Sequence, residues 1–193
     1  MEIYIIMAKS EILSPFILSW ESDKYTNNKY DLGKATKYGI TLATWRRVGY
    51  DKNSDGVLNE EDIKLLTVDD FHRVFKRNYW DACKADQIKD QSVANLLVDF
   101  AYNSGVARVS RFIQKIVGVT ADGIIGSKTI QAINNYPRGQ RQLFATLKQR
   151  RINYLNGVVI ANPTQKKFYN GWMNRVTAIG YGTLAYKGKV YSV

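Results

Sequence analysis

Apolar side chains recur at helical spacing through most of the chain. The first such stretch runs from Ser10 to Trp20, and Glu21 follows directly at its end. Thr41 is placed to cap a short helix that ends at Arg47. Further periodic stretches predict helices over residues 67–80, 86–103, 107–117, 127–135, 138–157 and 164–178, separated at Gly105, Gly123, Gly126, Pro137 and Pro163. The pattern therefore predicts a mainly α (α+β) fold.

Two segments lack this periodicity. Residues 22–40 are polar and rich in Tyr, Asn and Lys, and they contain Gly33 and Gly39, so they predict a loop or short hairpin strands. The tail, residues 181–193, alternates in polarity and predicts a small hairpin. The expected fold is helical, with one small hairpin or irregular insertion near the N-terminus.

Composition narrows the class of protein. The 193 residues suffice for one domain of about 150 residues or a compact pair. With 45% hydrophobic residues and only 3 prolines, the chain has the composition of a folded globule. Cys83 is the single cysteine, which excludes an internal disulfide and a cysteine-ligated zinc site. His72 is the single histidine, which excludes chemistry that needs two imidazoles.

The net charge of +11 is unevenly distributed. Residues 1–122 contain as many basic as acidic side chains, whereas no Asp or Glu follows Asp122. The whole positive excess therefore lies in the last part of the chain, which predicts a polyanionic partner there. Nucleic acid, anionic lipid and the carboxylate-bearing bacterial cell wall are the candidates.

The sequence contains no stretch that approaches the ~20 apolar residues of a membrane span. The apolar residues 3–7 are too few for the hydrophobic region of a secretory signal, and Glu2 precedes them. We expect a soluble protein without a classical signal peptide. The sequence leaves its oligomeric state open.

The acidic stretch from Asp51 to Asp62 has the spacing of a calcium loop. Gly56 stands at the sixth position, where the chain must turn sharply around a cation. The expected oxygen ligands, with Val57 contributing its carbonyl, are Asp51, Asn53, Asp55, Val57, Asn59 and Asp62. Asp62 replaces the usual bidentate Glu. The pattern predicts structural Ca²⁺, and the alternative is an acidic surface loop that binds no metal.

Two motifs near the N-terminus carry a resemblance to a known family. They are Phe16-Ile17-Leu18-Ser19-Trp20-Glu21 and Asp31-x-Gly33-x-x-Thr36-x-x-Gly39-Ile40-Thr41-x-x-Thr44-Trp45. Together they resemble glycoside hydrolase family 108, the lysozyme-like N-acetylmuramidases, some of which are labelled secretion activators. The chain departs from the family pattern where Ser22-Asp23-Lys24-Tyr25 replaces a Gly-Gly-Tyr and where Lys34 replaces a glycine.

Two later motifs extend the resemblance. Residues 97–105 are similar to the Phe-Asn-x-Gly helix that lines the sugar cleft of phage-type lysozymes. Residues 111–129, with an Asp-Gly-x-x-Gly turn at Asp122, resemble the peptidoglycan-binding module joined to this family. The resemblance implies a lysozyme-like catalytic region over residues 1–105, a helical peptidoglycan-binding region over residues 106–180, and a tail over residues 181–193.

The resemblance also implies roles for individual residues. Glu21 occupies the position of the catalytic acid, and Thr36 is placed to orient a water molecule. The reaction also needs a second carboxylate across the cleft, for which Asp31 in the expected hairpin is our first choice. Apolar neighbours and a helix C-terminus would both favour the protonated form of Glu21, as a general acid requires. The plainer alternatives are a solvated surface acid for Glu21 and a turn former for Asp31.

Sugar binding falls to aromatic and amide side chains near these residues. Tyr25, Tyr38 and Tyr102 are candidates to stack on sugar rings, although such aromatics also complete cores. Asn103 is a candidate to contact a sugar amide, or else it caps its helix before Gly105. We expect no catalytic role for His72 or Cys83.

Three function classes follow. The first is a muramidase that cleaves the β-1,4 bond between N-acetylmuramic acid and N-acetylglucosamine in peptidoglycan glycan strands, as a bacterial or phage protein acting on the cell wall. The second is a non-catalytic peptidoglycan-binding or secretion accessory protein. The third is nucleic-acid binding, which only the uneven charge suggests, and we expect no nucleic-acid partner.

Overall fold

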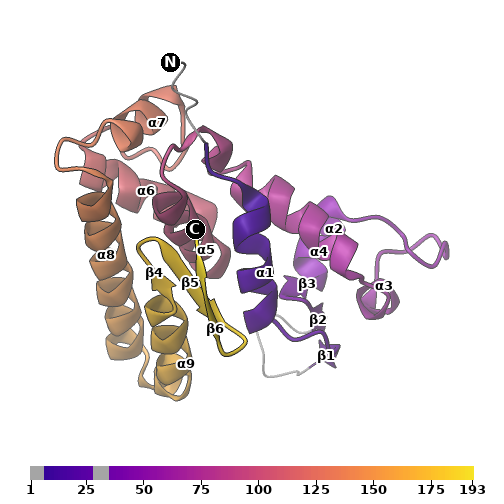
Figure 1. Ribbon diagram of the computed structural model, residues 1–193. Coiled ribbons are helices and arrows are strands. Elements are labelled where there is room, and N and C mark those ends of the chain that lie inside the picture. The colour runs from indigo at the N-terminus through magenta and orange to yellow at the C-terminus, as the bar shows by residue number, and fades with distance from the viewer. Residues whose placement is uncertain (1–6, 28–34) are drawn as a thin grey trace.

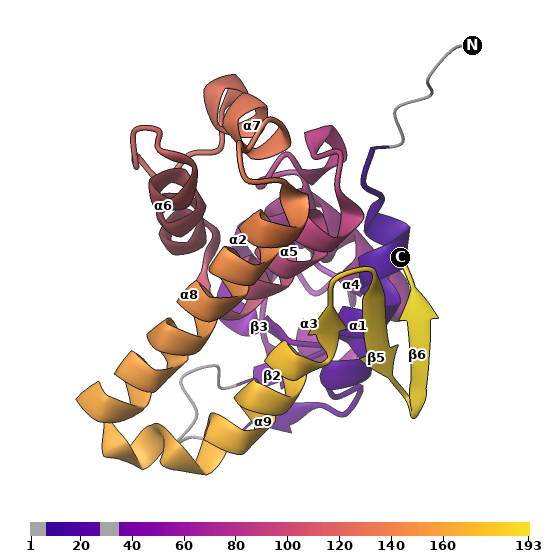
Figure 2. The ribbon, with the colours of Figure 1, turned by 60° about the vertical axis from the view of Figure 1, so that its left-hand side comes forward.

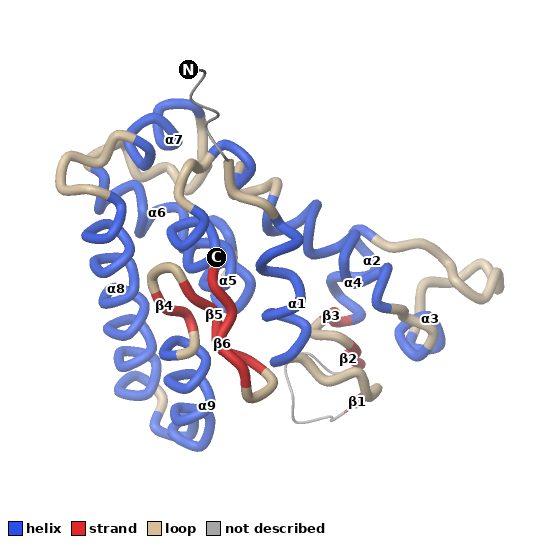
Figure 3. Tube along the Cα trace, viewed as in Figure 1, coloured by secondary structure: helices blue, strands red, loops and turns tan. Residues whose placement is uncertain are grey.

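The computed structural model describes residues 7–27 and 35–193, which form the mainly helical fold that the sequence predicts (Figures 1 and 3). The helices in these ranges are α1 (Ser10–Trp20), α2 (Leu42–Val48), α3 (Glu60–Lys64), α4 (Val68–Phe75), α5 (Gln91–Ser104), α6 (Val106–Val117), α7 (Ser127–Asn134), α8 (Gln140–Ala161) and α9 (Lys166–Thr177). Short turns of other helix types are η1 (Lys76–Trp80, a π-helix), η2 (Ala85–Gln87) and η3 (Pro163–Gln165).

Two small antiparallel sheets accompany the helices. The first contains β1 (Thr26–Asn27), β2 (Ala35–Lys37) and β3 (Ile40–Thr41), and the second contains β4 (Ile179–Gly180), β5 (Thr183–Tyr186) and β6 (Lys189–Ser192). The first is the insertion predicted near the N-terminus, and the second is the predicted hairpin of the tail, enlarged by one strand. Figure 1 shows α1 with one sheet on each side.

Helix α5 lies at the centre of the core. Every residue from Ser92 to Ala101 is buried, so this helix is enclosed on all sides, as its almost continuous apolar sequence requires. The helices α1, α6 and α8 and the strand β4 all contact it. Helices α8 and α9 contact each other, and the chain reverses direction between them through η3 (Figure 2).

Several predicted boundaries need correction. The predicted helix over 86–103 begins only at Gln91, because the Asp90 side chain accepts from the Val93 N–H and caps it there. The predicted helix over 67–80 changes to a π-helix after Phe75. Thr41 caps α2 as expected, its hydroxyl accepting from the Thr44 N–H at 3.1 Å.

The second sheet supports the helix that carries Glu21. The Tyr186 ring of β5 lies edge-on to Phe16 of α1, with 5.9 Å between centroids. Between the sheet and α5, the Tyr181 hydroxyl donates to Asp90 at 2.7 Å and the Gly182 N–H donates to Ser92 at 2.8 Å. The last residues of the chain are therefore part of the scaffold of its first helix.

Across residues 7–27 and 35–193, no helix combines the length and the apolar character needed to cross a membrane. Arg150 and Arg151 interrupt the longest helix, α8.

Candidate active site

Glu21 lies where α1 ends. Its backbone is extended and its N–H closes the last turn of the helix by donating to the Leu18 carbonyl at 3.3 Å. Its side chain is only 17% exposed, and Oε1 accepts from Arg175 Nη1 at 2.8 Å. Glu21 is therefore a largely enclosed carboxylate with one charged partner, which rules out the plain surface acid considered above.

A tight turn covers one side of this carboxylate. Tyr38 and Gly39 both have positive φ, +52° and +70°, and form the two-residue turn between β2 and β3. A Cβ on Gly39 would lie 2.8 Å from Glu21 Oε2 and 2.4 Å from the Tyr102 hydroxyl. Only glycine fits both the conformation and the space, so the glycine of the Gly39-Ile40-Thr41 motif lets the hairpin close onto Glu21.

Tyr102 supports this turn. Its hydroxyl donates to the Tyr38 carbonyl at 3.1 Å, and its ring packs against Tyr79 with 4.7 Å between centroids. Burial, and after it the charge of Glu21, raises the pKa of Tyr102 well above its usual value. The hydroxyl therefore keeps its proton and its hydrogen bond to the hairpin.

A buried ion-pair network connects Glu21 to the centre of the fold. Asp99 of α5 is fully buried, and its Oδ1 accepts from Arg175 Nε at 2.9 Å and Nη2 at 2.8 Å. Its Oδ2 accepts from Arg151 Nη1 at 2.6 Å. Burial alone would raise the pKa of Asp99, but Arg175 and Arg151 outweigh burial and hold that pKa below its usual value. The two carboxylates and two guanidinium groups balance in charge.

The Glu21 side chain borders a cavity of about 760 Å³ between the end of α1, the end of α5, and the helices α8 and α9. We call it the Glu21 cavity. The described residues that line it are Trp20, Glu21, Asn103, Ser104, Arg151, Tyr154, Leu155, Val158, Gln165, Lys167, Phe168, Gly171, Trp172 and Arg175. Residues from both predicted regions, before and after residue 105, thus form its wall.

Aromatic rings are exposed in the wall of the Glu21 cavity. Trp20 is 37% exposed and Phe168 is 47% exposed. Phe168 and Trp172 stack along α9, with 6.1 Å between centroids and 28° between ring planes. Exposed aromatic faces beside charged groups are suited to the apolar faces and hydroxyls of sugar rings.

The structure brings some of the predicted site residues together and separates others. Asn103 lines the Glu21 cavity and its Oδ1 accepts from Arg151 Nη2 at 2.7 Å. Thr36 lies in the middle of β2, paired with Thr26 and Thr41. Tyr25 donates to Glu60 of α3 at 3.1 Å, which ties its hydroxyl to that helix. Asp31 lies outside the described residues.

Sequence reasoning missed the two arginines of the network. Arg175 is 154 residues from Glu21, and Arg151 is 52 residues from Asp99, so no local spacing connects them. One signal was available, because Asp99 stands alone in the apolar run of α5, and a buried carboxylate needs a cationic partner. The basic stretch after Asp122 supplies both partners.

Cys83 and His72, for which we expect no catalytic role, both lie outside the lining of the Glu21 cavity. Cys83 is fully buried, and burial raises the pKa of its thiol to about 12, so it is unreactive at neutral pH. His72 is exposed and its ring contacts Phe71, with 5.3 Å between centroids. Asp122 forms the expected turn by accepting from the Ile124 N–H at 2.9 Å.

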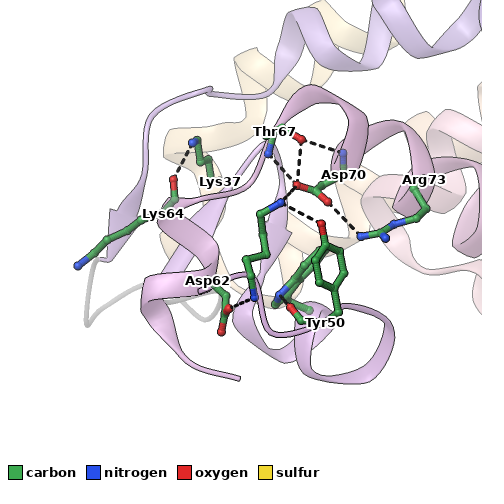
Figure 4. A network of polar contacts seen from close by, with 9 residues as sticks. Lys37, Tyr50, Asp62, Lys64, Thr67, Asp70 and Arg73 are labelled. Atoms are coloured by element: carbon green, nitrogen blue, oxygen red, sulfur yellow. Dashed lines mark hydrogen bonds and ion pairs between the residues drawn. The ribbon is translucent and has the colours of Figure 1, made fainter. Parts of the chain in front are cut away.

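Hydrogen bonds within the loop Asp51–Asp62 order it, and Figure 4 shows the contacts of Asp62 and Asp70 where the loop meets α4. Asp51 accepts from Ser54 and Gly56 N–H groups, each at 2.7 Å. Asp62 is buried and accepts from the Lys52 N–H at 2.6 Å and the Asn59 N–H at 2.8 Å. The Lys52 ammonium in turn pairs with Asp70 of α4 at 2.6 Å. The loop is therefore closed on itself and anchored to α4.

The oxygens of this loop suit a hard cation in kind. Within the described ranges, no group of three or more His, Cys, Asp or Glu side chains is placed to hold a metal. The carboxylates of Asp51, Asp55 and Asp62 thus do not converge, because Asp62 turns toward backbone amides. The predicted ligand set also includes Asn53, Asn59 and the Val57 carbonyl, so calcium at this loop stays a prediction.

An enclosed carboxylate borders an aromatic cavity in this mainly helical fold, and this arrangement suits a carbohydrate-active protein. The family model described as Glycosyl hydrolase 108 matches residues 14–105, and the model described as Predicted Peptidoglycan domain matches residues 108–177. The solved structure of SagA from Brucella abortus is similar at 30% sequence identity and a TM-score of 0.70, over 88% of this chain and 90% of that chain. No curated protein sequence matches the chain.

The chain belongs to glycosyl hydrolase family 108. With the peptidoglycan domain that follows, it is a peptidoglycan-related hydrolase, as the sequence motifs predict.

Proposed function

We propose that the protein is an N-acetylmuramidase that cleaves the β-1,4 bond between N-acetylmuramic acid and N-acetylglucosamine, with Glu21 as the general acid. The observation that carries this proposal is the position of Glu21, an enclosed carboxylate at the edge of an aromatic cavity of about 760 Å³. A cavity of this size holds a disaccharide-sized ligand. Peptidoglycan glycan strands are the substrate.

Cleavage of the glycosidic bond requires a proton on the leaving oxygen. A neighbouring guanidinium favours an ionised carboxylate, which opposes this role. Arg175, however, gives two hydrogen bonds to Asp99 and only one to Glu21, so Asp99 holds the guanidinium in place when Glu21 acts as the acid. A sugar chain that fills the cavity would exclude water from the space beside Glu21.

In an inverting displacement, the same step also requires an activated water on the opposite face of the sugar ring. Asp31 remains our candidate for the base and Thr36 for the residue that orients the water. The support for Thr36 is its strand, since β2 leads directly into the turn that closes on Glu21. A separation of about 6.5–9.5 Å between the two carboxylates would give inversion at the anomeric carbon.

Substrate binding falls mainly to residues that the motifs did not indicate. We assign sugar stacking to Trp20, Phe168 and Trp172, since their rings are accessible in the cavity wall. Asn103 contacts the sugar from the end of α5. Tyr38 and Tyr102 instead hold the hairpin against Glu21, and Tyr25 ties the hairpin to α3.

The identity of the sugar at the new reducing ends shows which glycosidic bond the protein cleaves. After incubation of purified peptidoglycan with the protein and reduction with borohydride, mass spectrometry should find N-acetylmuramitol at the new reducing ends. N-Acetylglucosaminitol in its place would make the protein a glucosaminidase. Sedimentation of the protein with sacculi without new reducing ends would instead support the accessory, non-catalytic role.

We propose calcium binding at Asp51–Asp62 as a separate property. Because Asp62 must leave its backbone partners before the carboxylates can converge, we expect weak affinity, in about the millimolar range. Calorimetric titration of chelator-treated protein should show this binding, and Asp55→Ala should remove it, because Asp55 is an exposed candidate ligand. Glu61→Ala, outside the ligand positions, is the control. Absence of calcium heat at millimolar metal would contradict the proposal.

A further inference from the structure

A second groove adjoins the Glu21 cavity. It has a volume of about 420 Å³ and lies between α6 and α8, where its wall includes Phe112, Arg150, Asn153 and Gly157. Tyr154 and Val158 line both spaces, so the two are neighbours across a single turn of α8. We call it the Arg150 groove. A ligand bound in the cavity could extend a branch into it.

Arg150 lines this groove and Arg108 lies beside it, and each stands over an aromatic ring of the groove wall. The Arg150 guanidinium lies 4.7 Å from the centroid of Phe112, and that of Arg108 lies 5.3 Å from the centroid of Tyr154. Arg108 Nη1 also donates to the Tyr154 hydroxyl at 2.5 Å. Among the ion pairs of the described residues, neither arginine has a carboxylate partner. Both are held in place by the rings and keep donors for an incoming anion.

Neither helix stability nor packing requires glycine at position 157. It stands inside α8, where glycine lowers helix stability relative to alanine. A Cβ at this position would meet nothing within 4 Å, so neighbouring packing does not require its absence. Since Gly157 lines the Arg150 groove, its missing side chain leaves the floor of the groove open to a ligand.

We propose that the Arg150 groove binds the peptide stem of peptidoglycan, with Arg108 and Arg150 contacting its carboxylates. The inference rests on the proposed function, because the stem branches from the same N-acetylmuramic acid whose bond is cleaved. Small apolar side chains of a stem suit the floor formed by Gly157 and Val158, and its free carboxylates match two arginines that lack acidic partners. The chain offers no acidic residue after Asp122 to compete for them.

Binding of a soluble stem tetrapeptide tests the inference without any turnover. We expect wild type to bind the peptide, and the double variant Arg108→Gln/Arg150→Gln to bind it about 10-fold or more weakly, since charge-assisted hydrogen bonds are lost. Gly157→Leu should weaken binding by filling the groove. A stem peptide whose carboxylates are amidated should bind as weakly as the unamidated peptide binds to the double variant. Isothermal titration calorimetry or NMR chemical-shift changes measure these four affinities.

Two control variants are matched to these. Arg138→Gln removes an exposed arginine away from the groove, and Ala145→Leu adds the same side chain on an exposed face of α8. Both should bind the tetrapeptide like wild type. Equal affinity of wild type, the double variant and Gly157→Leu for the peptide, or absence of binding to wild type, would overturn the inference.

Turnover separates this inference from the proposed function. Wild type should cleave stem-bearing glycan strands faster than strands stripped of their stems by an amidase, and the double variant should lose about 10-fold of that preference. Equal rates of wild type on both substrates would overturn the inference while supporting the hydrolase. Cleavage of neither substrate would reject the proposed activity, and the peptide titration would still decide the groove.

Discussion

Glu21→Gln is expected to lower the rate of peptidoglycan hydrolysis about 10²–10⁴-fold, because glutamine cannot deliver a proton to the leaving oxygen. The substitution keeps the size of the side chain and an oxygen that accepts from Arg175. Asp99 continues to hold Arg175 by two hydrogen bonds, so the network should persist. The loss should therefore fall on turnover rather than on folding. Release of reducing ends from isolated sacculi measures it.

The matched control is Asp23→Asn, which neutralises an exposed carboxylate two residues further along the chain. It should hydrolyse sacculi like wild type. Thermal unfolding of both variants should stay close to that of wild type, which shows that any loss of activity is chemical. If Glu21→Gln released reducing ends as fast as wild type, Glu21 would not be the general acid.

The fold could largely be predicted from hydrophobic periodicity. The bounds of α1 agree with the sequence because its apolar face is continuous and a polar segment follows it directly. The predicted start of α5 was wrong because the residues before Gln91 are also compatible with a helix. Only the hydrogen bond from the Val93 N–H to the Asp90 side chain fixes where α5 begins. The π-helix after Phe75 has no signature in the pattern of polarity.

The sequence predicted only those residues of the candidate site that lie in short local motifs. Glu21 and Gly39 stand in short motifs near the N-terminus, and the structure places them in contact distance of each other. The other wall of the cavity comes from α8 and α9, more than 100 residues further along the chain. Trp172 and Arg175 face Glu21 only through tertiary packing, for which a single sequence gives no register.

Loss of the buried carboxylate at the centre of the network should have the largest effect on stability. We expect Asp99→Ala to lower the free energy of unfolding by about 3–5 kcal/mol, because it leaves Arg151 and Arg175 buried without their common partner. Chemical denaturation measures this change. Asp81→Ala is the control, since Asp81 pairs with Lys76 at the surface and its loss should cost at most about 1 kcal/mol. Similar losses for the two variants would contradict the central role of Asp99.

The same network predicts how stability depends on pH. The pKa of Asp99 is lower in the folded state than in the unfolded chain, so the unfolded state takes up the proton first as the solution is acidified. The stabilisation from Asp99 is thus complete above its unfolded pKa of about 3.9 and is lost as pH falls through its lower folded value. Asp99→Asn removes this contribution while keeping the size of the side chain. Its free energy of unfolding should therefore fall less steeply than that of wild type between about pH 5 and pH 2. Parallel curves for the two proteins would mean that Asp99 does not titrate differently in the folded state, and that the arginines are held by contacts other than its charge.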